Sequence, residues 1–191
     1  MIEVPAALKE KVSREGLWVF AYGSLMWRPN FPHRQMEPAR LFGYHRSLCI
    51  YSTAYRGTYE RPGLVFGLNT GGSCQGLAIN VAPEHVDETM RYLYEREMIT
   101  RVYVPKWLPV HFNNRPPSKK TEVNWVFVAD RDHEQYTGRI SIDEQVTLVK
   151  QGCGKAGPCI DYLRSTLEHL HSLGIRDRSL ETVVRRVDTD D

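Results

Sequence analysis

Glu97 is the residue whose position most clearly suggests chemistry. Helical steps back from it reach three apolar residues, Leu93, Met90 and Val86. A carboxylate on the buried face of the helix predicted over residues 83–97 is costly, and burial raises its pKa toward the range useful for proton transfer. Glu97 is therefore a candidate general base. The alternative is that it reaches solvent at the helix end or pairs with an arginine such as Arg56 or Arg101.

The apolar stretch that contains Tyr22-Gly23-Ser24-Leu25 is the second feature of interest. It reads WVFAYGSLMW, and its aromatic and β-branched residues predict a strand over residues 17–22. The strand stops at a glycine, which has no Cβ and lets a ligand approach the backbone closely. We refer to Tyr22–Leu25 as the YGSL segment.

Length and composition are those of one globular domain, which we expect to span residues 1–191. The chain is 41% hydrophobic and 25% charged, and its formal net charge of +2 argues against nucleic-acid binding. No apolar run approaches the roughly 20 residues of a membrane helix, and the first 16 residues lack an apolar signal core. We therefore expect a cytoplasmic protein with neither nucleic-acid nor membrane partners. We also expect a monomer, although no sequence feature specifies the oligomeric state.

The cysteine and histidine positions predict no metal site. Cys49, Cys74, Cys153 and Cys159 form no C-x-x-C pair, and they are expected to be free thiols in a reducing compartment. The seven histidines are scattered along the chain.

The order of the predicted elements favours an α+β fold with a mostly antiparallel sheet that could curl into a barrel. Strands are predicted over residues 17–22, 39–51, 64–69, 74–81, 102–112 and 121–130, with Gly71-Gly72 as a hairpin turn between two of them. Helices are predicted over residues 83–97, from a capping box at Ser141–Glu144, over residues 158–173 and over residues 177–187.

An ordered set of motifs resembles the γ-glutamylcyclotransferase superfamily, in particular its ChaC-like, glutathione-specific branch. The matching pieces are VFAYGSLMW (19–27), LFGYHRSLCIYS (41–52), the S-T-x-x-R-G stretch (52–57), Arg61-Pro62-Gly63, Gly76, Tyr92-Leu93 with Arg96-Glu97, and Gly152–Leu163. They occur in the family's order over about residues 17–175, which we take as the core of the domain. The resemblance implies a small mixed or antiparallel β-barrel flanked by helices.

The resemblance also implies a reaction. The γ-glutamyl α-amine of glutathione attacks its own γ-carbonyl, which yields 5-oxoproline and releases Cys-Gly. The substrate carries its nucleophile, so the enzyme mainly orients the chain. Glu97 is implied to be the catalytic glutamate, taking a proton from the ammonium and returning one to the leaving amine. No metal or other cofactor is required.

The YGSL segment supplies candidate substrate contacts. The backbone N–H groups of Gly23, Ser24 and Leu25 can hold a carboxylate or the developing oxyanion. Ser24 is expected to donate a hydrogen bond rather than act as a nucleophile, although it could simply stabilise the turn. Tyr22 could orient the substrate or pack in the core.

Three further residues are candidate substrate contacts with structural alternatives. Arg56 could bind a carboxylate of glutathione, or it could form a structural ion pair. Tyr103 could donate a hydrogen bond into the site, or it could pack in its strand. Tyr162 lies on the C-terminal helix and is the third candidate.

The chain departs from the family pattern in two places. Thr100-Arg101 stands where a glycine is expected after the catalytic glutamate, and Ala156–Cys159 stands where relatives tend to read S-G-x-N. The lost asparagine puts one substrate contact in doubt, and Cys159 in its place is expected to be buried rather than exposed.

Two alternatives to glutathione degradation stay open at this point. The chain could cyclise other γ-glutamyl peptides or amines, because the pocket walls decide the substrate. It could also be a non-catalytic binding or regulatory protein, associated with cation transport, on the same fold.

Overall fold

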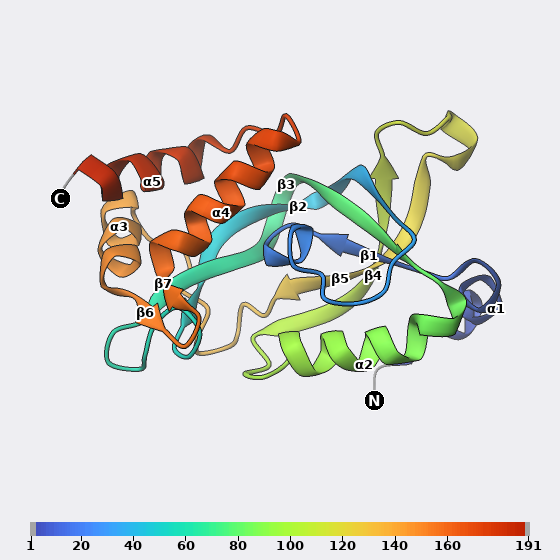
Figure 1. Ribbon diagram of the computed structural model, residues 1–191, viewed down its shortest axis with the longest axis horizontal. Helices are drawn as coiled ribbons and strands as arrows, with labels where there is room; N and C mark the ends of the chain where they lie inside the picture. The colour runs from blue at the N-terminus through green and yellow to red at the C-terminus, as the bar shows by residue number, and fades with distance from the viewer. Residues whose placement is uncertain (1–2, 190–191) are drawn as a thin grey trace. The chain divides into compact units, whose positions relative to one another are not determined.

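The computed structural model of the protein describes residues 3–189 (Figure 1). The two ends of the predicted 1–191 domain, residues 1–2 and 190–191, lie outside the described residues. The helices are α1 (Ala6–Glu15), α2 (Val86–Glu97), α3 (Ile142–Gln151), α4 (Cys159–Ser172) and α5 (Arg178–Thr189), with 3₁₀ helices η1 (Ser24–Met26), η2 (Pro83–His85) and η3 (Pro117–Lys119). The strands are β1 (Leu17–Ala21), β2 (Gln35–Ser52), β3 (Gly63–Val81), β4 (Tyr103–Phe112), β5 (Thr121–Ala129), β6 (Cys153–Gly154) and β7 (Gly157–Pro158).

Five strands form a closed barrel in the order β1-β3-β2-β4-β5. Strand β1 pairs antiparallel with β3, from Leu17 opposite Val81 to Ala21 opposite Leu77, and parallel with β5 through Val19 and Trp125. The barrel is thus mixed, and the predicted α+β class with a helix-flanked barrel is confirmed.

The chain forms two compact units. Of the described residues, the first unit holds 3–45 together with Thr70–Val128, and it contains β1, η1, α1, α2 and β4. The second unit holds Arg46–Asn69 and residues 129–189, and it contains α3, α4 and α5. Strands β2 and β3 each contribute residues to both units.

Strand β3 differs from the prediction, which placed a hairpin turn at Gly71-Gly72. The segment is one continuous strand, Gly63–Val81, and the predicted hairpin between residues 64–69 and 74–81 is wrong. Both glycines do have the positive φ angles that a turn would use, 95° for Gly71 and 68° for Gly72. Here the two glycines lie within the strand and do not reverse its direction, as residues at a β-bulge do.

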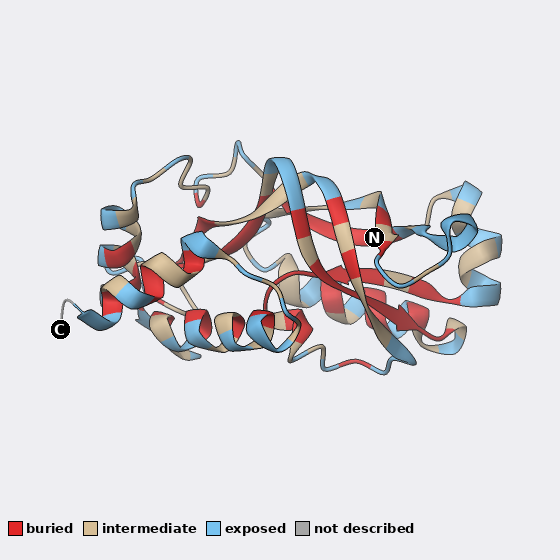
Figure 2. Ribbon diagram, turned by 90° about the horizontal axis from the view of Figure 1, so that it is seen from above, coloured by how far each residue is buried: buried red, intermediate tan, exposed pale blue. Residues whose placement is uncertain are grey.

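The helices of the second unit begin where their sequences predict, and α5 runs two residues past its predicted end at residue 187. Ser141 and Glu144 form the capping box of α3, and Asp177 Oδ1 accepts a hydrogen bond from the Leu180 N–H at the start of α5. Gly174, with φ 70°, follows the end of α4. Helices α3, α4 and α5 contact one another and share one apolar core (Figures 1 and 2).

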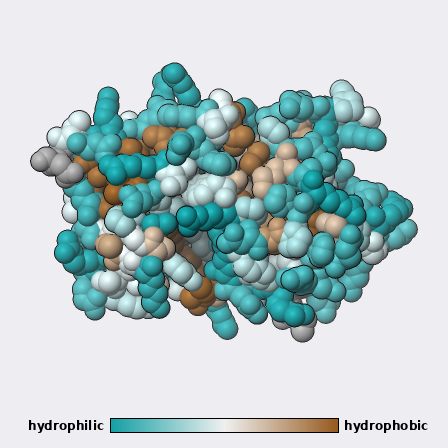
Figure 3. Space-filling view, in the orientation of Figure 1, coloured by the Kyte–Doolittle hydropathy of each residue, from teal (hydrophilic) through white to brown (hydrophobic). Residues whose placement is uncertain are grey.

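Among the described residues, no helix is long and apolar enough to cross a membrane. Residues 3–189 also contain no group of three or more His, Cys, Asp or Glu side chains that could hold a metal ion. The face in Figure 3 is mostly hydrophilic, with small separate hydrophobic areas.

Candidate active site

Helix α2 places Glu97 at its C-terminal end, on the side that its sequence predicts. The buried residues of the helix are Val86, Thr89, Met90 and Leu93. Glu95 is exposed, together with Glu88 and Arg91 on the same side. Glu97 continues the buried stripe, and only 19% of its side chain is accessible to solvent.

The surroundings of Glu97 perturb its carboxyl group in two opposing ways. Desolvation raises its pKa above the ordinary value of 4.5, and the positive charge of Arg96 opposes that rise. Arg96 Nε lies 3.2 Å from Glu97 Oε1, so the carboxylate pairs with its sequence neighbour. The sequence predicts an arginine such as Arg56 or Arg101 as a possible partner, and the structure shows Arg96 instead.

Arg96 also connects α2 to the segment that follows β1. Its Nη2 donates a hydrogen bond to Ser24 Oγ at 2.9 Å, and its Nη1 donates to the Arg28 carbonyl at 2.8 Å. The same Nη1 donates to the Tyr92 hydroxyl at 2.9 Å, one helical turn before Arg96. One guanidinium group therefore contacts both Ser24 and Glu97.

The YGSL segment turns directly into the 3₁₀ helix η1. The first hydrogen bond of that turn runs from the Met26 N–H to the Gly23 carbonyl, at 2.9 Å. The N–H groups of Ser24 and Leu25 precede this bond and so have no partner within the turn. Gly23 and Leu25 are buried, whereas Ser24 is partly accessible.

The two aromatic candidates of the first unit occupy different settings. Tyr22 is buried, and its hydroxyl donates a hydrogen bond to the Phe127 carbonyl of β5 at 2.9 Å. This contact fixes Tyr22 in the barrel, as its packing alternative expects. Tyr103 is the first residue of β4 and is partly accessible.

Arg56 and Tyr162 lie together in the second unit. The Arg56 guanidinium is 5.6 Å from the centre of the Tyr162 ring, and its Nη1 donates a hydrogen bond to the Pro158 carbonyl at 3.0 Å. The Tyr162 hydroxyl accepts from the Phe66 N–H at 3.5 Å. These contacts give both residues a structural role, and their role in substrate binding stays a prediction.

Cys159 is buried, as expected, and it makes hydrogen bonds of its own at the position where the family pattern has an asparagine. Its thiol donates to the Leu64 carbonyl at 3.1 Å and accepts from the Leu64 N–H at 3.3 Å. Burial raises its pKa to about 11. The side chain thus holds the start of α4 to β3.

The four thiols are expected to differ sharply in reactivity. Cys153 is exposed, whereas Cys49, Cys74 and Cys159 are buried, and burial also raises the pKa of Cys49 to about 11. A thiolate-specific reagent should therefore label one cysteine rapidly in the folded protein and all four after denaturation. Counting the labels by mass spectrometry checks this, with Cys153→Ser as the control. Rapid labelling of that variant would contradict the burial of the other three.

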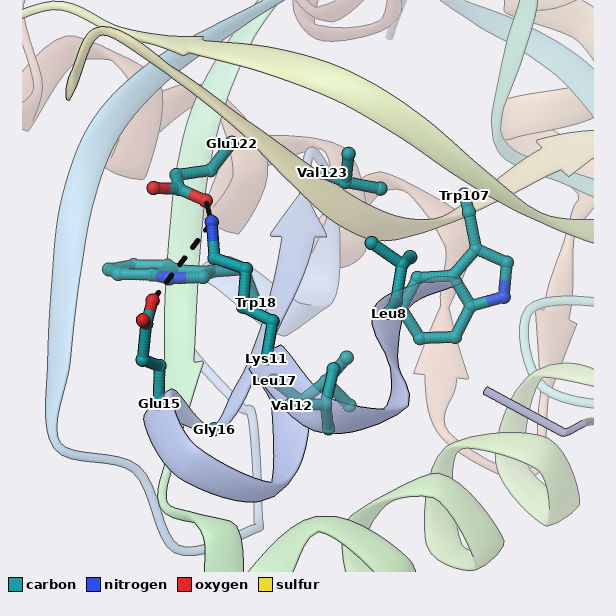
Figure 4. A pocket seen from close by; sticks show the side chains of 10 residues that line it. All are labelled: Leu8, Lys11, Val12, Glu15, Gly16, Leu17, Trp18, Trp107, Glu122 and Val123. Carbon is teal, nitrogen blue, oxygen red and sulfur yellow. Dashed lines mark hydrogen bonds and ion pairs between the residues drawn. The ribbon is translucent and has the colours of Figure 1, made fainter. Parts of the chain in front are cut away.

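A small pocket beside α1 contains none of the predicted site residues (Figure 4). Apolar side chains of Leu8, Val12 and Trp107 form one part of its wall. Lys11 reaches between Glu15 and Glu122, which pair with its ammonium group. The charged groups that line this pocket, those of Lys11, Glu15 and Glu122, are thus paired with each other.

The structure brings Ser24 and Glu97 to one cation, which the sequence did not predict. Arg96 belonged to a matching motif but had no assigned role. Its spacing of four from Tyr92 could have indicated their contact on one helix face. The bond to Ser24 spans 72 positions of the sequence and has no local signal.

Comparisons with known proteins show which family the sequence matches. The ChaC-like protein family model matches residues 17–190. The glutathione-specific γ-glutamylcyclotransferase of Escherichia coli K12 is 32% identical over 168 residues, which cover 88% of this chain and 71% of that protein. The protein of the same name from Schizosaccharomyces pombe is 28% identical, with 92% of this chain and 96% of that protein covered.

A solved structure shares the fold. The crystal structure of a selenomethionine-labelled γ-glutamyl cyclotransferase specific to glutathione, from yeast, matches with a TM-score of 0.83. The match covers 90% of this chain and 95% of the yeast chain at 22% sequence identity.

Proposed function

The chain belongs to the ChaC-like family, and we propose that it is a γ-glutamylcyclotransferase that degrades glutathione. Relatives named for this activity, from Escherichia coli, mouse and Schizosaccharomyces pombe, align over most of the chain at 28–32% identity. The observation that carries the proposal is the desolvated carboxylate of Glu97, placed beside a cation that also binds the YGSL segment.

In the proposed reaction Glu97 moves protons. It takes a proton from the γ-glutamyl ammonium, and the freed amine attacks the γ-carbonyl to close a five-membered ring. The bond from that carbonyl to the cysteine nitrogen then breaks, and Glu97 returns the proton to the leaving amine. The second proton that the ring nitrogen loses as it becomes an amide also goes to this amine, which is released as an ammonium. The products are 5-oxoproline and Cys-Gly, with no water consumed. A raised pKa suits a group that must both accept and return a proton near neutral pH.

The YGSL segment is proposed to hold the oxygen that gains charge during ring closure. The N–H groups of Ser24 and Leu25 have no partner within their turn, and a pair of backbone donors can stabilise an oxyanion. Gly23 leaves room for the substrate against the backbone. Tyr22, Arg56, Tyr103 and Tyr162 remain proposed contacts for the rest of the substrate.

We further propose that the enzyme acts as a cytoplasmic monomer. The cytosol is the compartment in which glutathione keeps thiols reduced, so it is where such a substrate is plentiful.

A panel of γ-glutamyl compounds tests the substrate class. Reduced glutathione, γ-glutamylcysteine, γ-glutamylalanine and a γ-glutamyl amine would be incubated separately with the purified chain, and 5-oxoproline would be quantified. We expect kcat/KM to be highest for glutathione. A higher value for γ-glutamylalanine or the amine would show a different substrate. No 5-oxoproline from any compound would contradict cyclotransferase activity.

A further inference from the structure

Arg96 makes polar contacts through all three nitrogen atoms of its guanidinium group. Nη1 and Nη2 bind oxygen atoms of Ser24, Arg28 and Tyr92, and Nε faces the Glu97 carboxylate. The Arg96 side chain is 23% accessible, and its hydrogen bonds to Ser24 and Tyr92 are partly buried, whereas the one to the Arg28 carbonyl is exposed. Such an arrangement fixes the plane of the guanidinium and, with it, the groups on its two sides.

We propose that Arg96 is a positioning residue that holds the YGSL segment and the Glu97 carboxylate in one fixed arrangement for the reaction. This inference rests on the proposed function and deepens it. The YGSL segment and Glu97 come from distant parts of the chain, β1–η1 and the end of α2. A shared cation sets the distance between the proposed oxyanion donors and the proposed base, and misplacement by 1 Å can cost about 10²-fold in rate.

The contacts at position 96 require the planar guanidinium group of arginine, which donates to several acceptors at once. Contacts at Nη2, Nη1 and Nε point in three directions from one rigid group. A lysine ammonium is a single point charge and cannot reach all these acceptors together. The Arg96 guanidinium also lies 5.9 Å from the Tyr92 ring centre, which restricts it further.

The charge of Arg96 has a separate effect from its shape. From the other segments that contact the guanidinium, the facing groups are neutral: the Ser24 hydroxyl and the carbonyls of Arg28 and Pro29. On α2 itself the Tyr92 phenol faces it. In the described part of the chain, Arg96 is the charged group that lowers the pKa of Glu97 against desolvation. Loss of this charge therefore favours the protonated form of Glu97.

Two substitutions separate the effect of the positive charge of Arg96 from the effect of its planar guanidinium geometry. Arg96→Gln removes both, so kcat should fall about 10- to 100-fold, and the acidic limb of the kcat/KM pH profile should move to higher pH. Arg96→Lys keeps the charge, so kcat should fall while the acidic limb stays near its wild-type position. Tyr92→Phe removes one acceptor only, and it should give a smaller fall with no movement of the limb. Arg91→Gln, on the exposed face of the same helix, is the matched control.

Titration of the Glu97 carboxyl by ¹³C NMR gives a readout that does not need turnover. The signal is assigned by its absence in Glu97→Gln, and its pKa should be higher in Arg96→Gln than in the wild type. If the wild type cyclises no γ-glutamyl compound, the proposed function fails. In that case the NMR titration alone decides whether Arg96 controls the protonation of the Glu97 carboxyl group.

The inference is overturned if a folded Arg96→Gln keeps the kcat, the acidic limb and the Glu97 titration of the wild type. It is also overturned if Arg96→Gln and Arg96→Lys lose only thermal stability, because a merely structural arginine would have that effect. Thermal unfolding of each variant, compared with Arg91→Gln, identifies that case.

Discussion

Replacement of Glu97 by glutamine is expected to lower kcat/KM for glutathione by about 10²- to 10⁴-fold, the range for loss of a general acid–base group. Glutamine keeps the shape of the side chain and can accept no proton at neutral pH. The change is measured by 5-oxoproline release from the folded variant. Glu95→Gln, on the exposed face of α2, is the control and should retain wild-type activity.

The same substitution should affect stability with a defined pH dependence. Because burial raises the pKa of Glu97 in the folded state, its ionisation destabilises the fold as pH rises through that pKa. Glutamine does not ionise, so the Tm difference between Glu97→Gln and the wild type should shift in favour of the variant from acidic to neutral pH. A shift in the opposite direction would mean that the folded state prefers the carboxylate.

Replacement of Gly152 by alanine is expected to destabilise the second unit strongly. An added Cβ would lie 2.5 Å from the Arg56 carbonyl oxygen and 2.5 Å from the Gly63 Cα, both backbone atoms that cannot turn aside. The φ and ψ of Gly152, −74° and 118°, suit alanine, so the effect is purely steric. We expect the free energy of unfolding to fall by about 3 kcal/mol, which would lower Tm by roughly 6–12 °C.

Thermal unfolding measures this loss, and Lys155→Ala is its control. Lys155 lies in the turn between β6 and β7, and its side chain is exposed, so the control should change Tm little. A Tm of Gly152→Ala close to that of the control would show that the segment around Arg56 can move away. That result would contradict the close packing of Gly152 on Gly63.

The fold could largely be predicted because local signals and burial agree. The strand at residues 103–112 and the capping box at Ser141 were placed within a residue or two from composition and spacing. The error at Gly71-Gly72 has a physical reason. Positive φ serves turns and bulges alike, and only the partner strand decides between them.

The arrangement of the candidate site could be predicted from the sequence only in part. The helical stripe placed Glu97 toward the buried side, because periodicity reports the direction of a side chain. It could not report that Arg96 would reach Ser24, since that contact depends on the path of distant segments. From the family pattern alone, Cys159 indicates only that an asparagine contact is missing. In the structure its thiol forms hydrogen bonds with both the backbone N–H and the carbonyl of Leu64.

The departure at Thr100-Arg101 also has a structural explanation. Arg101 has φ 59°, a left-handed conformation that glycine adopts at little cost. The glycine expected near this position would suit such a turn. The chain keeps a left-handed residue after α2 even though its sequence lacks the glycine.

The most direct test of cyclotransferase activity is product analysis of reduced glutathione incubated with the purified protein in H₂¹⁸O. Intramolecular cyclisation predicts equal amounts of 5-oxoproline and Cys-Gly by mass spectrometry, with no ¹⁸O in the 5-oxoproline. Release of ¹⁸O-labelled glutamate would instead show hydrolysis by water. That result, or unchanged glutathione with a well-folded protein, would contradict the account.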